Sequence, residues 1–224
     1  MPSNARKKFD ENARDIDQLI DLYKGVVTLY KYQREAVPEG SEVLFRSAIV
    51  LMVSHWEAYV EDICGEALDH LVTHVSGPTK LPKEIKKHVA REIKASKNEI
   101  EVWRLAGQGW KNYLHSRMST LRLARNRSFS TPRAQHTAEF IRQTIGIEDI
   151  RESWNFDGKD STTISRQLDN LVEIRGEIAH RGRVGRRLDA EFVTDHTAFL
   201  RKLVSKTGGQ INKYVKQISG AGLF

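Results

Sequence analysis

The stretch SAIVLMVSHWEAYVEDIC, residues 47–64, lies at the centre of the most apolar segment of this chain. Apolar side chains recur at helical spacing on both sides of it, from Val43 to Val72. A helix that is apolar on most of its sides is buried among other elements. The sequence therefore predicts that this segment is the central helix of an α-helical bundle.

Three further segments carry an apolar stripe at the same spacing, and the alternating pattern of β-strands is scarce. We expect an all-α fold built on a four-helix bundle, with helices over about residues 6–36, 41–76, 161–182 and 189–218. Smaller helices over about 81–159 are expected to form an insertion between the two halves, and residues 1–224 to form a single domain.

Polar residues and glycines predict where the bundle helices begin and end. Side chains that accept a hydrogen bond from the first helical turn are favoured as N-caps. We expect Ser41 to cap the central helix, Ser161 or Thr162 to cap the third, and Asp189 to cap the last. The glycine pair at 208–209 is expected to interrupt this last helix.

The insertion reads as a set of shorter helices. A polar helix is expected over about 82–106 and a second over about 110–125, followed by a loop at 126–131. Thr131 is expected to cap a short helix that ends at Gly146.

Composition limits the class of protein. The chain has 36 Lys and Arg against 29 Asp and Glu, a formal charge of +7, and its hydrophobic fraction of 39% suffices for a core. An excess of positive charge on one face favours binding to a polyanion such as nucleic acid, whereas spread evenly it only keeps a protein soluble. The position of the charge therefore matters more than its sum.

The cellular setting is predicted from three features. Cys64 is the only cysteine, so no intrachain disulfide forms, as is usual in a reducing compartment. The charged residues 1–10 lack the apolar core of a secretory signal, and the longest apolar run, 48–53, is too short to span a bilayer. We expect a cytoplasmic protein without a membrane partner.

Several familiar motifs are missing. The sequence has no GxGxxG, no GxxxxGK followed by Ser or Thr, no GxSxG and no HExxH, which excludes nucleotide-fold enzymes and α/β-hydrolases. A di-metal bundle needs two Glu-x-x-His pairs, and only Glu177 with His180 has that spacing. His70 and His74 could chelate one ion, but such a pair is more often a solvated helix end. We expect no metal and no cofactor.

The positive charge gathers in LVEIRGEIAHRGRVGRR, residues 171–187. Arg175 and His180 fall near the end of a predicted helix, and a glycine-punctuated turn follows with Arg181, Arg183, Arg186 and Arg187. A guanidinium can bind a phosphate through two hydrogen bonds, and an imidazole can transfer protons near neutral pH. Together these groups supply the chemistry of phosphodiester cleavage.

A purely structural alternative uses the same residues. Arg175 would form an ion pair with Glu57 or Glu61, and His180 would interact with the negative end of its helix. Residues five apart on an undistorted helix diverge by about 140°, so Arg175 and His180 of one chain do not face one phosphate. A two-fold axis would supply second copies of both, and Gly176 could loosen the helix locally.

The segment IRGEIAHRG resembles the R-x4-6-H motif of HEPN proteins, the higher eukaryote and prokaryote nucleotide-binding superfamily. Residues 47–64 resemble the Trp-Glu-Ala-Tyr helix of its RiboL-PSP branch and of a second nuclease branch. The segment STPRAQHTAEFIRQTIGIEDIRESW, residues 130–154, is similar to the linker region of the same branches. The resemblance covers the chain from about Ser41 to about Phe199.

This resemblance implies an α-helical bundle that dimerises and, in active members, cleaves RNA without a metal, with the ribose 2′-hydroxyl as nucleophile. Arg175 matches the arginine of the motif, His180 its histidine, and Glu57 the acidic residue of the upstream helix. Active members usually carry a polar residue after the arginine, and Gly176 departs from that pattern.

Three hypotheses follow. The first is a homodimeric, metal-independent endoribonuclease, a toxin or defence effector controlled by an antitoxin or other partner protein, whose arginines at 181, 183, 186 and 187 bind RNA phosphates. The second is a non-catalytic HEPN module that binds RNA, a nucleotide or a partner protein. The third is a structural helical adaptor.

Overall fold

The computed structural model describes residues 2–117 and 131–224, and this part of the chain is all-α. Within the described residues no strand forms, and one isolated β-bridge joins Phe156 to Lys159 in a tight turn. The prediction of an all-α fold is confirmed.

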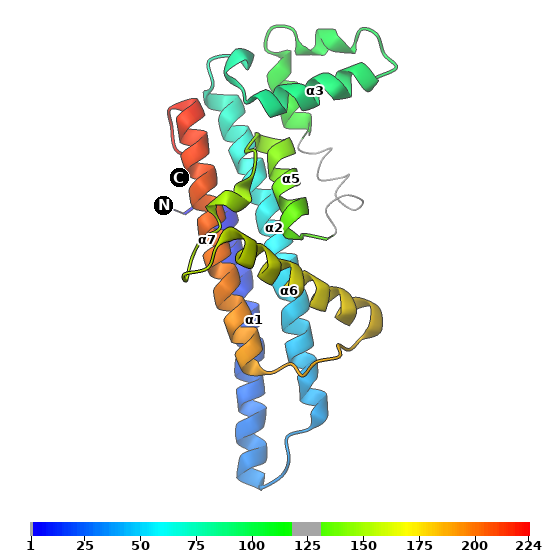
Figure 1. Cartoon of the computed structure of the whole chain (residues 1–224), viewed down its shortest axis with the longest axis vertical. Helices are drawn as coiled ribbons and strands as arrows, with labels where there is room; N and C mark the ends of the chain where they lie inside the picture. Colours follow the sequence, from blue (N-terminus) through cyan, green and yellow to red (C-terminus); the bar gives the residue numbers. More distant parts are fainter. Residues whose placement is uncertain (1, 118–130) are drawn as a thin grey trace.

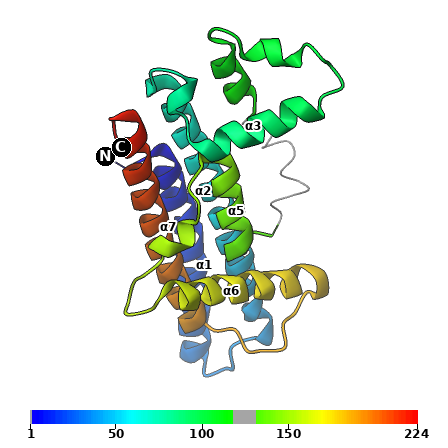
Figure 2. The same cartoon turned by 45° about the horizontal axis from the view of Figure 1, so that its top comes forward.

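Three long helices lie side by side: α1 (Asn4–Gln33), α2 (Val43–His74) and α7 (Ala190–Ser219) (Figures 1 and 2). Two more pack against α2, namely α5 (Ala134–Ile145) and α6 (Ser161–Arg181). Unlike a parallel fourth bundle helix, α6 crosses α2 at a large angle (Figure 1). The short α5 and the crossing α6 therefore both cover α2, where a four-helix bundle would have one long parallel helix.

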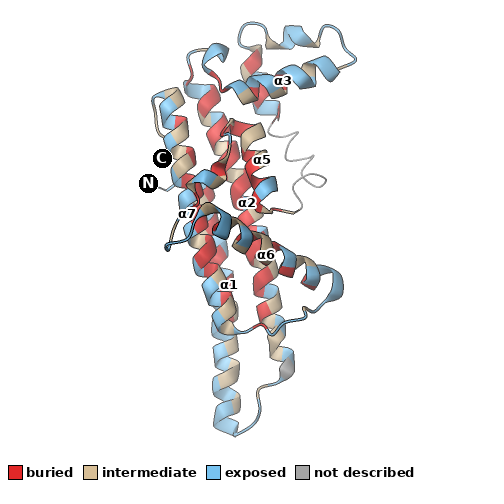
Figure 3. Cartoon of the chain, in the orientation of Figure 1, coloured by how far each residue is buried: buried red, intermediate tan, exposed pale blue. Residues whose placement is uncertain are grey.

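The predicted central position of α2 is confirmed. Its buried side chains are concentrated where the other helices meet (Figure 3), and Trp56 is completely buried, with its ring 6.2 Å from that of Trp154 and 6.0 Å from that of Tyr59. The Trp154 indole N–H donates to Thr207 Oγ1 at 3.0 Å. Residues 40–74 are long and apolar enough to cross a membrane by composition, as many core helices are.

The helix starts differ in part from expectation. Asp189 caps α7 as predicted. The prediction for Ser41 is wrong, because a 3-10 turn, η1 (Glu39–Glu42), leads directly into α2. The prediction of a cap at 161–162 is also wrong, since the carboxylate of Asp160 accepts from the first turn of α6 and binds more strongly than a hydroxyl.

The expected single helix at 82–106 is wrong. The chain forms α3 (Lys83–Ala95) and then a 3-10 turn, η3 (Glu101–Leu105). The Ser96 hydroxyl accepts from the Asn98 N–H at 3.1 Å, and the Asn98 side chain accepts from a backbone N–H two residues further on. Such local side-chain bonds compete with helical hydrogen bonds and end the helix.

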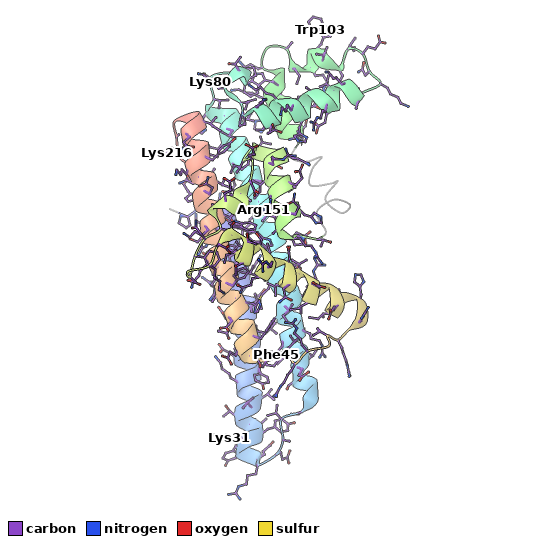
Figure 4. All side chains as sticks on the ribbon, viewed as in Figure 1. Lys31, Phe45, Lys80, Trp103, Arg151 and Lys216 are labelled. Atoms are coloured by element: carbon purple, nitrogen blue, oxygen red, sulfur yellow. The ribbon has the colours of Figure 1, made fainter. Side chains whose placement is uncertain are left out.

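The rest of the insertion consists of short helices and 3-10 turns. The next helix is described over 109–117, and the expected end of this helix near 125, with the loop after it to 130, falls outside the described residues. Arg133 rather than Thr131 is the N-cap of α5, while Gly146 ends α5 as predicted, with φ of 90°. Short turns η2 (Pro78–Lys80) and η4 (Ile150–Ser153) complete the fold. Trp103 projects from the tip of the insertion (Figure 4).

The expected interruption of the last helix at Gly208 and Gly209 is wrong, since α7 is continuous. Gly208 instead allows α2 and α7 to approach closely, because a Cβ there would lie 2.6 Å from Tyr59 Oη. Tyr59 Oη is fixed by donating to the Val204 carbonyl at 3.0 Å. Gly209 has open space where its Cβ would be.

These neighbouring glycines give a matched prediction. Gly208→Ala should lower the free energy of unfolding by about 1–3 kcal/mol, because the new methyl displaces the Tyr59 hydroxyl in a close-packed contact. Gly209→Ala should raise it by about 0.5–1 kcal/mol, because alanine favours the helix and meets no obstacle. Urea unfolding of both variants measures the difference, and equal effects would contradict the close contact.

Candidate functional site: the end of α6 and the arginine loop

The last turns of α6 carry the two predicted catalytic side chains. The helix forms because Asp160 caps its start, and its apolar residues pack inward: Ile164, Leu168, Leu171, Val172, Ile174 and Ile178. It ends at Gly182, whose φ of 69° is the left-handed conformation that glycine adopts without strain. The chain then turns back toward α7 through residues 182–189, the arginine loop (Figure 1).

Arg175 and His180 have different surroundings. Arg175 is half-buried, with its Nε atom inside the protein, whereas His180 is exposed. The helix stays regular through Gly176, so the expected local loosening does not occur. The two side chains therefore diverge by about 140° around the helix axis and do not converge within one chain. Gly176 has room for a side chain, because a Cβ there would meet nothing within 4 Å.

The acidic candidate Glu57 lies on α2, the helix against which α6 packs, and follows the buried Trp56. One turn further on, Glu61 is almost completely buried, with 1% exposure. Glu57, Glu61 and Arg175 each have an interaction partner in the protein. Pairing of Arg175 with either carboxylate stays a prediction.

The arginine loop forms one wall of a pocket of about 270 Å³, the arginine pocket. Arg183 and Arg186 line it from the loop, and Arg46 lines it from the first turn of α2, which the loop crosses. Arg181 and Arg187 are exposed and lie outside its lining. No motif in the sequence predicts Arg46 as a site residue, because its only signal is a single cation at the start of a strongly apolar helix.

An aromatic stack supports the loop from α7. The guanidinium of Arg186 lies 6.0 Å from the centre of the Phe192 ring. The His196 ring stacks on the Phe192 ring, with ring centres 3.9 Å apart. His196 Nδ1 donates to the Phe192 carbonyl at 2.8 Å. Burial lowers the pKa of His196, and the positive charge of Arg186 lowers it further.

The possible metal ligands do not assemble. His70 and His74 stack at 3.9 Å, and His70 Nε2 donates to the Ala221 carbonyl at 3.1 Å, so that nitrogen is occupied. Within the described ranges, no group of three or more His, Cys, Asp or Glu side chains could hold a metal ion.

The fold and the site define an α-helical protein with an Arg-x4-His element at the end of a core-packed helix, as in the HEPN superfamily. The family model RiboL-PSP-HEPN matches residues 10–213, and the chain therefore belongs to this family. No curated protein and no solved structure matches the chain.

The buried imidazole of His196 predicts a pH dependence of stability. Because its pKa is lower in the folded protein than in the unfolded chain, the unfolded chain takes up the proton first as the pH falls. The free energy of unfolding should therefore decrease as the pH is lowered below 6.5, and His196→Gln should make this decrease less steep. Urea unfolding at pH 8 and between pH 7 and 5 measures both slopes. Identical slopes for wild type and variant would contradict the prediction.

Proposed function

We propose that this protein is a metal-independent endoribonuclease, a toxin or defence effector under the control of an antitoxin or other partner. The observation that carries the proposal is the position of Arg175 and His180 on the last turns of α6, next to the arginine loop, in a chain of the RiboL-PSP-HEPN family. The loop supplies positive charge for the RNA backbone beside these two side chains.

The proposed chemistry is an internal transfer on the scissile phosphate. The ribose 2′-hydroxyl attacks phosphorus, the bond to the 5′-oxygen breaks, and the products carry a 2′,3′-cyclic phosphate and a 5′-hydroxyl. His180 transfers protons at these oxygens, for which its exposed position is suitable. Arg175 stabilises the charge that develops on the phosphate, and Glu57 is its acidic partner.

The divergence of Arg175 and His180 supports a composite site at a homodimer cleft. A second copy related by a two-fold axis would bring Arg175 of one protomer toward His180 of its partner. The end of α6 extends past α2 (Figure 1), so it is open to such an approach.

One observation favours a second candidate, a non-catalytic module that binds RNA, a nucleotide or a partner protein. Active relatives place a polar residue after the motif arginine, and this chain has Gly176 where packing leaves room for a larger side chain. In this case the arginines would bind the ligand without cleaving it.

The assembly is testable directly. The protein should be a two-fold dimer at micromolar concentration, because one chain does not bring Arg175 and His180 together. Multi-angle light scattering measures the mass, and a strictly monomeric protein would remove the composite site on which the nuclease proposal depends.

The chemistry gives the sharpest prediction. Arg175→Ala and His180→Ala should each lower the cleavage rate by about a hundredfold or more, because charge stabilisation and proton transfer are lost separately. Arg91→Gln on the distant α3 is the matched control and should cleave at the wild-type rate. Cleavage should persist in excess EDTA and should not occur on DNA, which lacks the 2′-hydroxyl.

The assay uses wild type and the three variants on single-stranded and structured RNAs, with circular dichroism to check folding and mass spectrometry to identify the cyclic phosphate. Activity that is absent from wild type on every RNA, or equal in His180→Ala, would refute the nuclease and leave the binding module.

A further inference from the structure

The arginine pocket holds more positive charge than its acidic neighbours neutralise. Its lining contains three guanidinium groups, from Arg46, Arg183 and Arg186, and one carboxylate, from Glu42. The closest approach between Arg46 and Glu42 is 4.0 Å, at the limit of an ion pair. Across the described part of the chain, neither Arg183 nor Arg186 forms an ion pair.

What distinguishes the pocket is that three guanidinium groups line it together with a single carboxylate. Several other arginines bond a carboxylate closely, among them Arg6, Arg104, Arg117, Arg142, Arg151 and Arg201. Arg46 is mostly withdrawn from solvent, with 24% of its side chain exposed, whereas Arg183 and Arg186 are exposed. A charge that is partly desolvated and weakly paired is stabilised by a bound counterion.

The start of α2 adds to the positive potential. Glu42 is the N-cap residue but makes no side-chain capping bond, and the first turn of α2 contains no acidic residue. The N-terminus of a helix carries partial positive charge, which favours an anion. Gly40 and Glu42, at this helix end, line the same pocket as the three arginines.

The pocket is also held in shape. Phe45 (labelled in Figure 4) is buried next to Arg46 and packs against Tyr23 with ring centres 4.5 Å apart, which fixes the first turn of α2. On the opposite wall, Leu188 is buried and the Phe192 ring supports Arg186. Arg46 and Arg186 are thus held on two walls of the pocket, which lowers the cost of ordering them around a ligand.

From these observations we propose that Arg46, Arg183 and Arg186 form a binding site for one phosphate group, that of the RNA strand beside the cleavage site. Guanidinium forks match the oxygens of a phosphate, and the apolar side chains of Val184 and Leu188 offer a wall for the attached nucleoside. The identity of the ligand as RNA rests on the proposed function.

The position of the pocket fits this role. Arg183 follows His180 by three residues, so their Cα atoms are at most about 11 Å apart. An RNA strand that contacts His180 can therefore reach the pocket within a short stretch. Arg46 then acts as a binding residue from a second helix, and Arg181 and Arg187 contribute only to the general field of the loop.

The test measures binding of a fluorescein-labelled single-stranded RNA with 2′-O-methyl riboses, which has no attacking hydroxyl. Arg46→Gln, Arg183→Gln and Arg186→Gln should each weaken binding by about tenfold, because each removes a charge-assisted bond to the phosphate. Arg91→Gln removes the same charge far from the pocket and should change binding less than twofold.

A double-mutant cycle shows whether the arginines share one ligand. If Arg46 and Arg183 hold the same phosphate, the double variant should bind only slightly more weakly than either single variant, and the salt dependence should decrease by about 0.7 in logarithmic slope, that of one phosphate on a single strand. Fully additive effects, or wild-type binding by Arg46→Gln, would overturn the pocket.

Competition with adenosine monophosphate and with inorganic phosphate distinguishes the sources of the phosphate. Competition by either ligand that is lost in Arg46→Gln supports the site and shows that it also accepts a free phosphate. RNA binding that depends on Arg46 in a protein without nuclease activity would keep the pocket and refute the nuclease. Cleavage with RNA binding unchanged in all three variants would keep the nuclease and refute the pocket.

Discussion

Burial of α2 among the other helices is the constraint on which the rest of the structure depends. Trp56 packs against the rings of Tyr59 and Trp154, and α1, α5, α6 and α7 all contact this helix. Burying one large apolar side chain contributes about 1.5–3 kcal/mol, and α2 buries residues of this kind along most of its length. The partners of α2 therefore gain their stability by lying against it.

The positions of the candidate site residues follow from that packing. Because α6 crosses α2 instead of running beside it, its apolar residues pack mainly against α2, with further contacts to α5 and η4, and its last turns lie at the edge of the core. The chain then returns to α7 through a loop that passes the beginning of α2 (Figure 1). This return brings Arg183 and Arg186 to the same pocket as Arg46, which is more than 130 positions earlier in the sequence.

Two glycines of the bundle helices differ in their packing. Gly208 is needed because Tyr59 occupies the space of its Cβ, whereas Gly176 has open space and no structural requirement. Packing therefore does not explain the glycine after the motif arginine, since the fold would accept a side chain there. In one chain the regular helix keeps Arg175 and His180 apart, and this divergence is the reason why the proposed site needs a second protomer.

The sequence by itself determined the all-α class, the central position of α2, the ends of α5 and α6 at glycines, and the Arg-x4-His element, because these depend on local periodicity, on backbone preferences and on short spacing. Only the tertiary structure decided the crossing of α6, the continuity of α7 through Gly208, and the convergence of Arg46 with the arginine loop. These features depend on which side chains meet across the core, and contacts between residues far apart in the chain leave no periodic signal in a single sequence.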